Sequence, residues 1–162
     1  MLLWPVQLAA PKLARSRHLD HLGSSRVRIG GIFTVDCSSG FVVSNRPLAG
    51  RVILVVEDEP LLALEMDKAL RVAGAKVVSA GFLESGLCST EHPQLAAAVV
   101  DLHLGDGNGT ALCRRLRQLG VPFVVHTGYP LMVTEREWSG ATVIYKPAHP
   151  DRIVAALVQL LA

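Results

Sequence analysis

The sequence has few aromatic residues, few cysteines and no long hydrophobic run. Aromatic side chains make up only 5% of the 162 residues, and the three cysteines, Cys37, Cys88 and Cys113, show no metal-type spacing. This pattern favours neither a disulfide framework nor a zinc site, so we expect a reducing compartment, the cytoplasm. No apolar run approaches the roughly 18 residues that a membrane-spanning helix needs, which predicts no insertion into a membrane.

Half of the residues are hydrophobic and 19% are charged, which is enough apolar material for one packed domain with a short appendage. The net charge of +2 is unevenly distributed along the chain. Residues 1–50 carry six Lys or Arg and two Asp or Glu, whereas residues 51–162 carry ten basic and twelve acidic residues. Because the larger part lacks the basic excess of a nucleic-acid binder, we predict no nucleic-acid partner.

The first fifty residues differ from the rest in the pattern of their apolar segments. Glycine, serine and proline interrupt every apolar run in 1–50, which predicts a disordered or weakly structured extension, with at best a weak hairpin between 28–34 and 40–44. From Arg51, short apolar segments alternate with helix-length amphipathic ones, as in a parallel sheet of βα units. We predict a domain at 51–162 with strands at 52–56, 76–80, 96–100, 123–126 and 142–145, and helices at about 60–73, 82–89, 109–118, 131–138 and 151–161.

Polar side chains follow the carboxyl ends of four predicted strands. Glu57 and Asp58 follow the first strand, Asp101 the third, Thr127 the fourth and Lys146 the fifth. Ligands of an open parallel sheet bind at this edge. Clustered carboxylates repel one another unless a cation joins them, and an all-oxygen set suits Mg²⁺. One carboxylate can then attack a phosphoryl donor while an ammonium and a hydroxyl hold the transferred oxygens, so the predicted chemistry is formation of an aspartyl phosphate.

Four segments carry a family resemblance. VILVVEDEP, AAVVDLHLGDGNG, PFVVHTGYP and VIYKP, in this order, resemble the receiver domain of two-component response regulators across essentially all of residues 51–162. The resemblance implies an α/β, flavodoxin-like (βα)₅ fold with a five-stranded parallel sheet of order 2-1-3-4-5. The segment PFVVHTGYP is also similar to the fourth-strand motif of the FAT GUY subgroup, in which an alanine stands where this chain has His126.

The resemblance implies a role for each polar residue at the strand ends. Asp101 matches the phosphoacceptor, Thr127 the switch hydroxyl, and Lys146 the family lysine, whose bond to Pro147 would be cis. The implied Mg²⁺ ligands are Glu57, Asp58, Asp101 and the backbone carbonyl of His103.

The chain ends at Ala162, directly after the last predicted helix, so we expect a single-domain response regulator rather than an enzyme with separate substrate turnover. By resemblance, it would take its phosphoryl group from a histidine kinase or a phosphotransfer protein and signal by contact with an unknown downstream protein. The strongly apolar last helix leaves a homodimer open.

The sequence leaves open two alternatives to a phosphorylated response regulator. One is a pseudo-receiver that docks to partners independently of phosphorylation. The other is a Mg²⁺-dependent aspartyl phosphohydrolase that uses Asp101 as its nucleophile. Such enzymes usually place a second acid two residues after the nucleophile, and His103 at that place counts against them.

Overall fold

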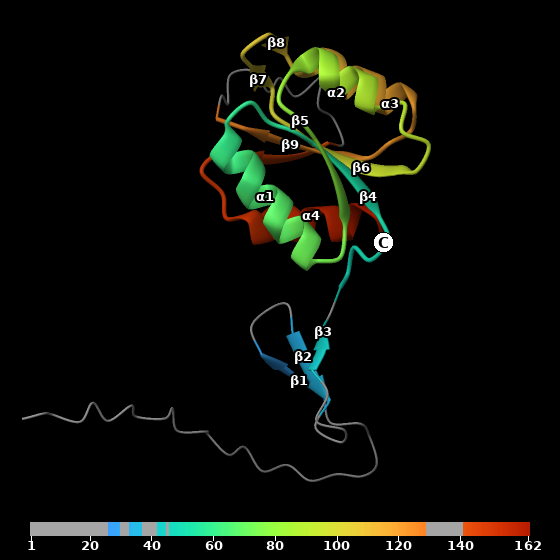
Figure 1. Ribbon diagram of the computed structural model, residues 1–162, viewed down its shortest axis with the longest axis vertical. Helices are drawn as coiled ribbons and strands as arrows, with labels where there is room; N and C mark the ends of the chain where they lie inside the picture. The colour runs from blue at the N-terminus through green and yellow to red at the C-terminus, as the bar shows by residue number, and fades with distance from the viewer. Residues whose placement is uncertain (1–25, 30–32, 37–41, 45, 129–140) are drawn as a thin grey trace, which may run out of the picture.

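The computed structural model describes residues 26–29, 33–36, 42–44, 46–128 and 141–162 (Figure 1). Its largest sheet is parallel, with neighbouring strands in the order β10-β9-β6-β4-β5. Counted along the chain from residue 52, these strands have the order 2-1-3-4-5, so the predicted flavodoxin-like fold is confirmed. The five strands are β4 (Val52–Val56), β5 (Lys76–Ala80), β6 (Leu95–Val100), β9 (Phe123–Thr127) and β10 (Thr142–Tyr145).

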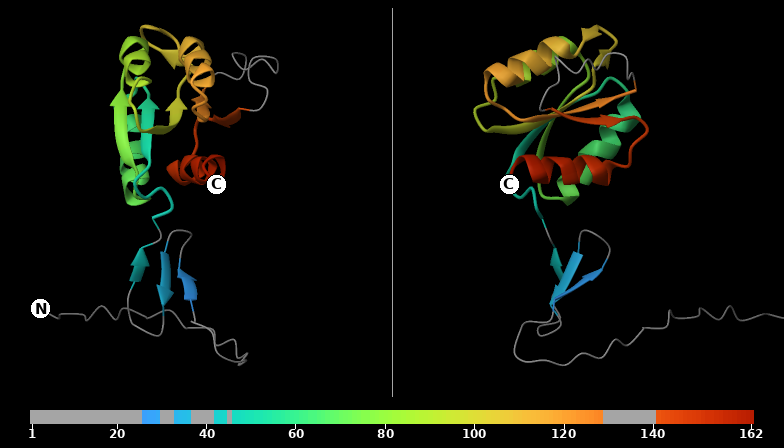
Figure 2. Two further views of the ribbon diagram at one scale, coloured as in Figure 1. Left: turned by 90° about the vertical axis from the view of Figure 1, so that its right-hand side faces the viewer. Right: turned by 180° about the vertical axis from the view of Figure 1, so that it is seen from behind.

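Helices cover both faces of this sheet (Figures 1 and 2). They are α1 (Pro60–Val72), α2 (Leu83–Ser89), α3 (Thr110–Gln118) and α4 (Pro150–Leu160), each within two residues of a predicted helix. The predicted helix at 131–138 lies outside the described residues. No helix in the described ranges is long and apolar enough to cross a membrane.

Strand β4, which lies between β6 and β5, explains why the sheet needs two covering layers. All five of its residues are buried, and successive side chains point to opposite faces. Ile53 and Val55 join one core cluster with α1 and α4, whereas Leu54 and Val56 join a second cluster with α2 and α3. Because both faces are filled with apolar side chains, polar groups of this sheet gather at the ends of its strands.

Local chemistry sets the helix ends near the predicted positions. Pro60 opens α1, where its fixed φ suits the first helical turn. Gly74 and Gly120 follow α1 and α3 with φ of 97° and 69°, a region that favours glycine. The last helix begins one residue earlier than predicted, with Pro150, and the His149 side chain accepts a hydrogen bond from the Asp151 amide at 3.3 Å.

A small antiparallel sheet precedes the large one in the chain. Its strands β1 (Arg26–Ile29), β2 (Phe33–Asp36) and β3 (Val42–Ser44) have the order β1-β2-β3. The segment 28–34 was expected to be one strand of a hairpin, but its described residues belong to two strands, β1 and β2. Strand β2 pairs with β1 on one side and with β3 on the other. Further along, Leu48 is fully buried in the main core, so core packing starts just before Arg51.

A short hairpin after β6 was not predicted from the sequence. It consists of β7 (His103–Leu104) and β8 (Gly107–Asn108), and Asp106 lies in its turn. The Asp106 carboxylate accepts hydrogen bonds from the amides of Leu83 at 2.8 Å and Glu84 at 3.4 Å. These amides belong to the first turn of α2, where no carbonyl of the helix is available to accept their hydrogen bonds. The hairpin therefore caps α2 from a distant part of the chain.

The Asp106→Ala variant should lose about 1 kcal/mol of unfolding free energy, because the first-turn amides of α2 lose their acceptor. Asp106→Asn is the matched control, since its amide oxygen can still accept from Leu83. Urea unfolding gives the stability, and hydrogen exchange at Leu83 and Glu84 should accelerate in the alanine variant. Equal exchange in both variants would contradict the capping role.

Candidate functional site

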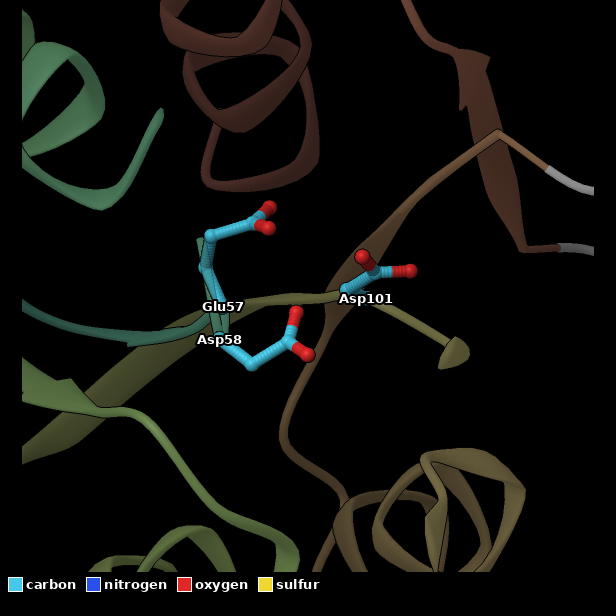
Figure 3. Close-up of side chains that lie close together, drawn as sticks. All are labelled: Glu57, Asp58 and Asp101. Atoms are coloured by element: carbon cyan, nitrogen blue, oxygen red, sulfur yellow. The ribbon is translucent and has the colours of Figure 1, made fainter. Parts of the chain in front are cut away.

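Three acidic side chains meet at the carboxyl edge of the sheet. Glu57 and Asp58 follow β4, and Asp101 follows the adjacent strand β6. One carboxylate oxygen from each lies within 4.8 Å of the others, and Figure 3 shows the three side chains extending towards a common space. Glu57 is 2% exposed and Asp101 4% exposed, so two of the three charges are held away from water. The predicted clustering of these acids is confirmed.

Lys146 supplies the positive charge of this cluster. It follows β10 at the edge of the sheet, and its ammonium lies 2.5 Å from Asp101 Oδ2 and 2.8 Å from Glu57 Oε1. A third carboxylate, that of Glu59, lies 3.7 Å away but is largely exposed. The Lys146–Pro147 peptide is cis, as the resemblance implies. Lys146, singled out from the sequence as the polar residue after the fifth strand, thus lies against two of the three acids.

Burial and pairing act on these groups in opposite directions. Burial alone would raise the pKa of the Glu57 carboxyl, but polar contacts from His126 and Lys146 and the charge of Lys146 lower this pKa below its ordinary value. Burial alone would lower the pKa of the Lys146 ammonium, but hydrogen bonds and charge attraction from Asp101 and Glu57 raise it. Both shifts keep the groups ionised, so the site combines several negative charges with one ammonium at neutral pH.

Main-chain amides hold the acids on their other side. The His103 amide donates to Asp101 Oδ1 at 2.9 Å, and the Gly105 amide donates to Asp58 Oδ2 at 3.0 Å. Both donors belong to the β7–β8 hairpin and its turn; sequence reasoning noted a glycine-rich turn at 105–109 but missed the two short strands. The glycine-rich run LGDGNG was the available signal, because such a run allows a tight turn.

Gly109 allows the chain to return close to Asp101. It precedes α3, and its amide donates to the Leu102 carbonyl at 3.0 Å. A Cβ atom at this position would lie 2.2 Å from the Asp101 carbonyl oxygen, far inside van der Waals contact. A glycine is therefore required here by space rather than by φ.

The end of β9 brings two more side chains to this region. Thr127 is fully buried as the last residue of the strand, one residue beyond the predicted end, and its carbonyl accepts from the Lys146 amide at 2.9 Å. His126 is 3% exposed, and its Nδ1 lies 3.8 Å from Glu57 Oε2. Sequence reasoning treated His126 only as a departure from a motif, although a histidine inside an apolar strand is a signal in itself.

The donor set fits a small divalent cation. The three clustered carboxylates provide oxygen ligands only, which suits Mg²⁺ better than a metal that prefers sulfur or nitrogen. His103 opens β7 beside Asp101, so the implied fourth ligand, its backbone carbonyl, belongs to the same edge of the sheet.

Comparison with known proteins gives one consistent family. The response regulator receiver domain model matches residues 53–158. The chain is 31% identical over 113 residues to the photosynthetic apparatus regulatory protein RegA of Rhodobacter capsulatus, covering 67% of this chain and 61% of that protein. It is 28% identical over 114 residues to the phyllosphere-induced regulator PhyR of Methylorubrum extorquens, covering 67% of this chain and 43% of that one. The chain spans only part of its curated relatives, 42% of the regulator PprB of Pseudomonas aeruginosa.

Solved structures agree with this result. A CheY-like receiver domain protein from Methanospirillum hungatei superposes with a TM-score of 0.61 at 25% identity, over 68% of this chain and 93% of that one. A response regulator from Burkholderia pseudomallei, crystallised with a phosphorylated aspartic acid, a calcium ion and citrate, gives a TM-score of 0.58 at 28% identity, over 66% of each chain.

The Gly109→Ala variant should lose about 2 kcal/mol of unfolding free energy or more, because its Cβ atom would collide with the Asp101 carbonyl oxygen. Gly81→Ala is the matched control, since a Cβ there would meet nothing closer than the Glu57 carbonyl at 4.0 Å. Urea unfolding of both variants tests this. Equal stabilities would show that the chain relaxes around Gly109 without cost.

The Lys146→Met variant should lose about 3 kcal/mol of unfolding free energy at pH 7, because Glu57 and Asp101 keep their buried charges without a cation. In the wild type, the lowered pKa of Glu57 gives stability above its ordinary value of 4.5 that is lost as pH falls through the folded value. In the variant, the contributions of Lys146 that lower this pKa are lost while the burial that opposes them remains, so the ionised Glu57 carboxylate should contribute less stability at pH 7 than in the wild type.

The stability difference between wild type and Lys146→Met should therefore shrink as pH falls from 7 to about 4. Urea unfolding across this pH range measures it. Lys76→Met, at an exposed position that opens β5, is the control and should change stability by less than about 0.5 kcal/mol at every pH. A constant difference for Lys146→Met would contradict the assigned pairing.

Proposed function

The chain belongs to the family of response regulator receiver domains, and from that premise we propose that it accepts a phosphoryl group on Asp101 with the help of Mg²⁺. The observation that carries the proposal is the buried acidic cluster, Glu57, Asp58 and Asp101, bridged by the Lys146 ammonium. A structural core has no need of such a cluster, because burying these charges costs free energy. Glu57, Asp58, Asp101 and the His103 carbonyl would hold the metal ion.

The two oxygens of Asp101 have different partners, and this difference suggests their roles. Oδ1 accepts from the His103 amide, which fixes the carboxylate to the main chain. Among the contacts between described residues, Oδ2 is paired with the ammonium at the end of the Lys146 side chain. We infer that Oδ2 attacks the phosphorus of the donor, so that an oxygen–phosphorus bond forms while the phosphorus–nitrogen bond of a phosphohistidine breaks and the imidazole leaves.

Lys146 and Thr127 would stabilise the transferred group. Once Oδ2 bonds to phosphorus, the carboxylate charge leaves with the imidazole, whose nitrogen takes up a proton, and the Lys146 ammonium can move a short distance to the dianionic phosphoryl oxygens. The Thr127 hydroxyl, at the neighbouring strand end, would donate to another phosphoryl oxygen. Bound Mg²⁺ would supply further positive charge to the same oxygens.

The phosphodonor and the output are proposed from the family. One relative is called a two-component response regulator, and such systems pass a phosphoryl group from a histidine kinase or a phosphotransfer protein. We propose the same donor class for this chain, a downstream protein partner for its output, a cytoplasmic site of action, and no turnover of a separate substrate.

Incubation with acetyl phosphate and Mg²⁺ should add one phosphoryl group to the wild type and none to Asp101→Asn, because the variant lacks the attacking carboxylate. Intact-mass spectrometry measures the adduct. Asp106→Asn is the matched control, since it removes a nearby carboxylate that caps α2, and it should be labelled like the wild type.

Two results would count against the proposal. One is an unlabelled wild type in conditions that label another receiver domain, which would favour docking without phosphorylation. The other is an adduct that persists in Asp101→Asn, which would place the modification elsewhere.

A further inference from the structure

We propose that His126 is a positioning residue that holds Glu57 for the metal ion by donating a hydrogen bond to its second carboxylate oxygen. This inference rests on the proposed function, because it concerns how the same site binds Mg²⁺. The FAT GUY motif, to which the segment PFVVHTGYP is similar, has an alanine where this chain has the imidazole of His126.

Unpaired polar atoms are concentrated at this one contact. Among buried side-chain atoms in the described part of the chain, only Glu57 Oε2 and the two ring nitrogens of His126 have no hydrogen-bond partner. Buried polar atoms are rarely left in this state, because each unpaired group costs free energy. Glu57 Oε2 and His126 Nδ1 lie 3.8 Å apart, about 1 Å more than a hydrogen bond. A small rotation of either side chain would satisfy both atoms.

The two oxygens of Glu57 face different groups. Oε1 accepts from the Lys146 ammonium at 2.8 Å and from the Glu59 amide at 3.4 Å, whereas Oε2 faces the imidazole. When Lys146 moves to the oxygens of a transferred phosphoryl group, Oε1 loses its strongest partner. A hydrogen bond from a ring N–H of His126 to Oε2 would then keep the carboxylate in place and leave Oε1 for the cation.

The surroundings of His126 suit this task. Its backbone is fixed within β9, where it lies opposite Ile144 in the parallel pairing with β10. His126 is also among the residues that line a cavity of about 620 Å³, together with Leu62, Gly128 and Lys146. Groups that orient a metal ligand in this way typically change metal affinity by about 10- to 100-fold when they are removed.

The test compares two variants of similar size. His126→Leu fills the space but has no donor, whereas His126→Gln keeps an N–H donor. Isothermal titration of the full chain with MgCl₂ should show about tenfold weaker binding for His126→Leu and near wild-type binding for His126→Gln. Without metal, His126→Leu should unfold within a few degrees of the wild type, because it loses the contact that lowers the Glu57 pKa but also removes two unpaired polar atoms from the interior. A merely structural role would not weaken Mg²⁺ binding while preserving stability.

The outcomes separate this inference from the proposed function. Wild-type Mg²⁺ affinity in His126→Leu, or equally weak binding in both variants, would overturn the role of His126 and leave the phosphoacceptor proposal intact. A wild type that binds no Mg²⁺ would overturn both. If His126→Leu does not fold, His126→Ala, which carries the residue of the related motif, replaces it with the same expected loss of affinity.

Discussion

One ammonium group has to balance a cluster of carboxylates inside the protein. Lys146 reaches from the edge strand of the sheet to Glu57 and Asp101, which are both almost completely buried. Without this pairing, burial would favour protonated acids, which are poor metal ligands and poor nucleophiles. The order of the strands matters for this reason, because it brings a lysine from the last strand to acids that follow the first and third.

The sheet keeps this charged edge separate from its apolar faces. Side chains of β4 alternate between the two core clusters. Neither layer of helices therefore has to accommodate a polar residue from this strand. Strand β9 is less uniformly apolar, because His126 lies one residue before its end, close to Glu57. An exception to the apolar pattern thus lies at the boundary between the core and the charged edge, where it can contact both.

The sequence alone was enough to predict the features that depend on strand ends and periodicity. Glu57, Asp101 and Lys146 directly follow apolar segments, so their meeting follows from the parallel sheet. It was not enough to predict the features that depend on contacts between distant segments. The capping of α2 by Asp106 links residues more than twenty positions apart, and the local sequence of neither segment predicts this contact. Likewise, the distance of His126 from Glu57 is known only once β9 and β4 are placed.

The β7–β8 hairpin supports the acids through its backbone rather than through its side chains. The amides of His103 and Gly105 hold Asp101 and Asp58, and every residue except proline offers such an amide. The support of Asp101 at position 103 consequently requires an amide and not a particular side chain. Related chains can therefore diversify the surroundings of the acid at this position without having to rebuild the site.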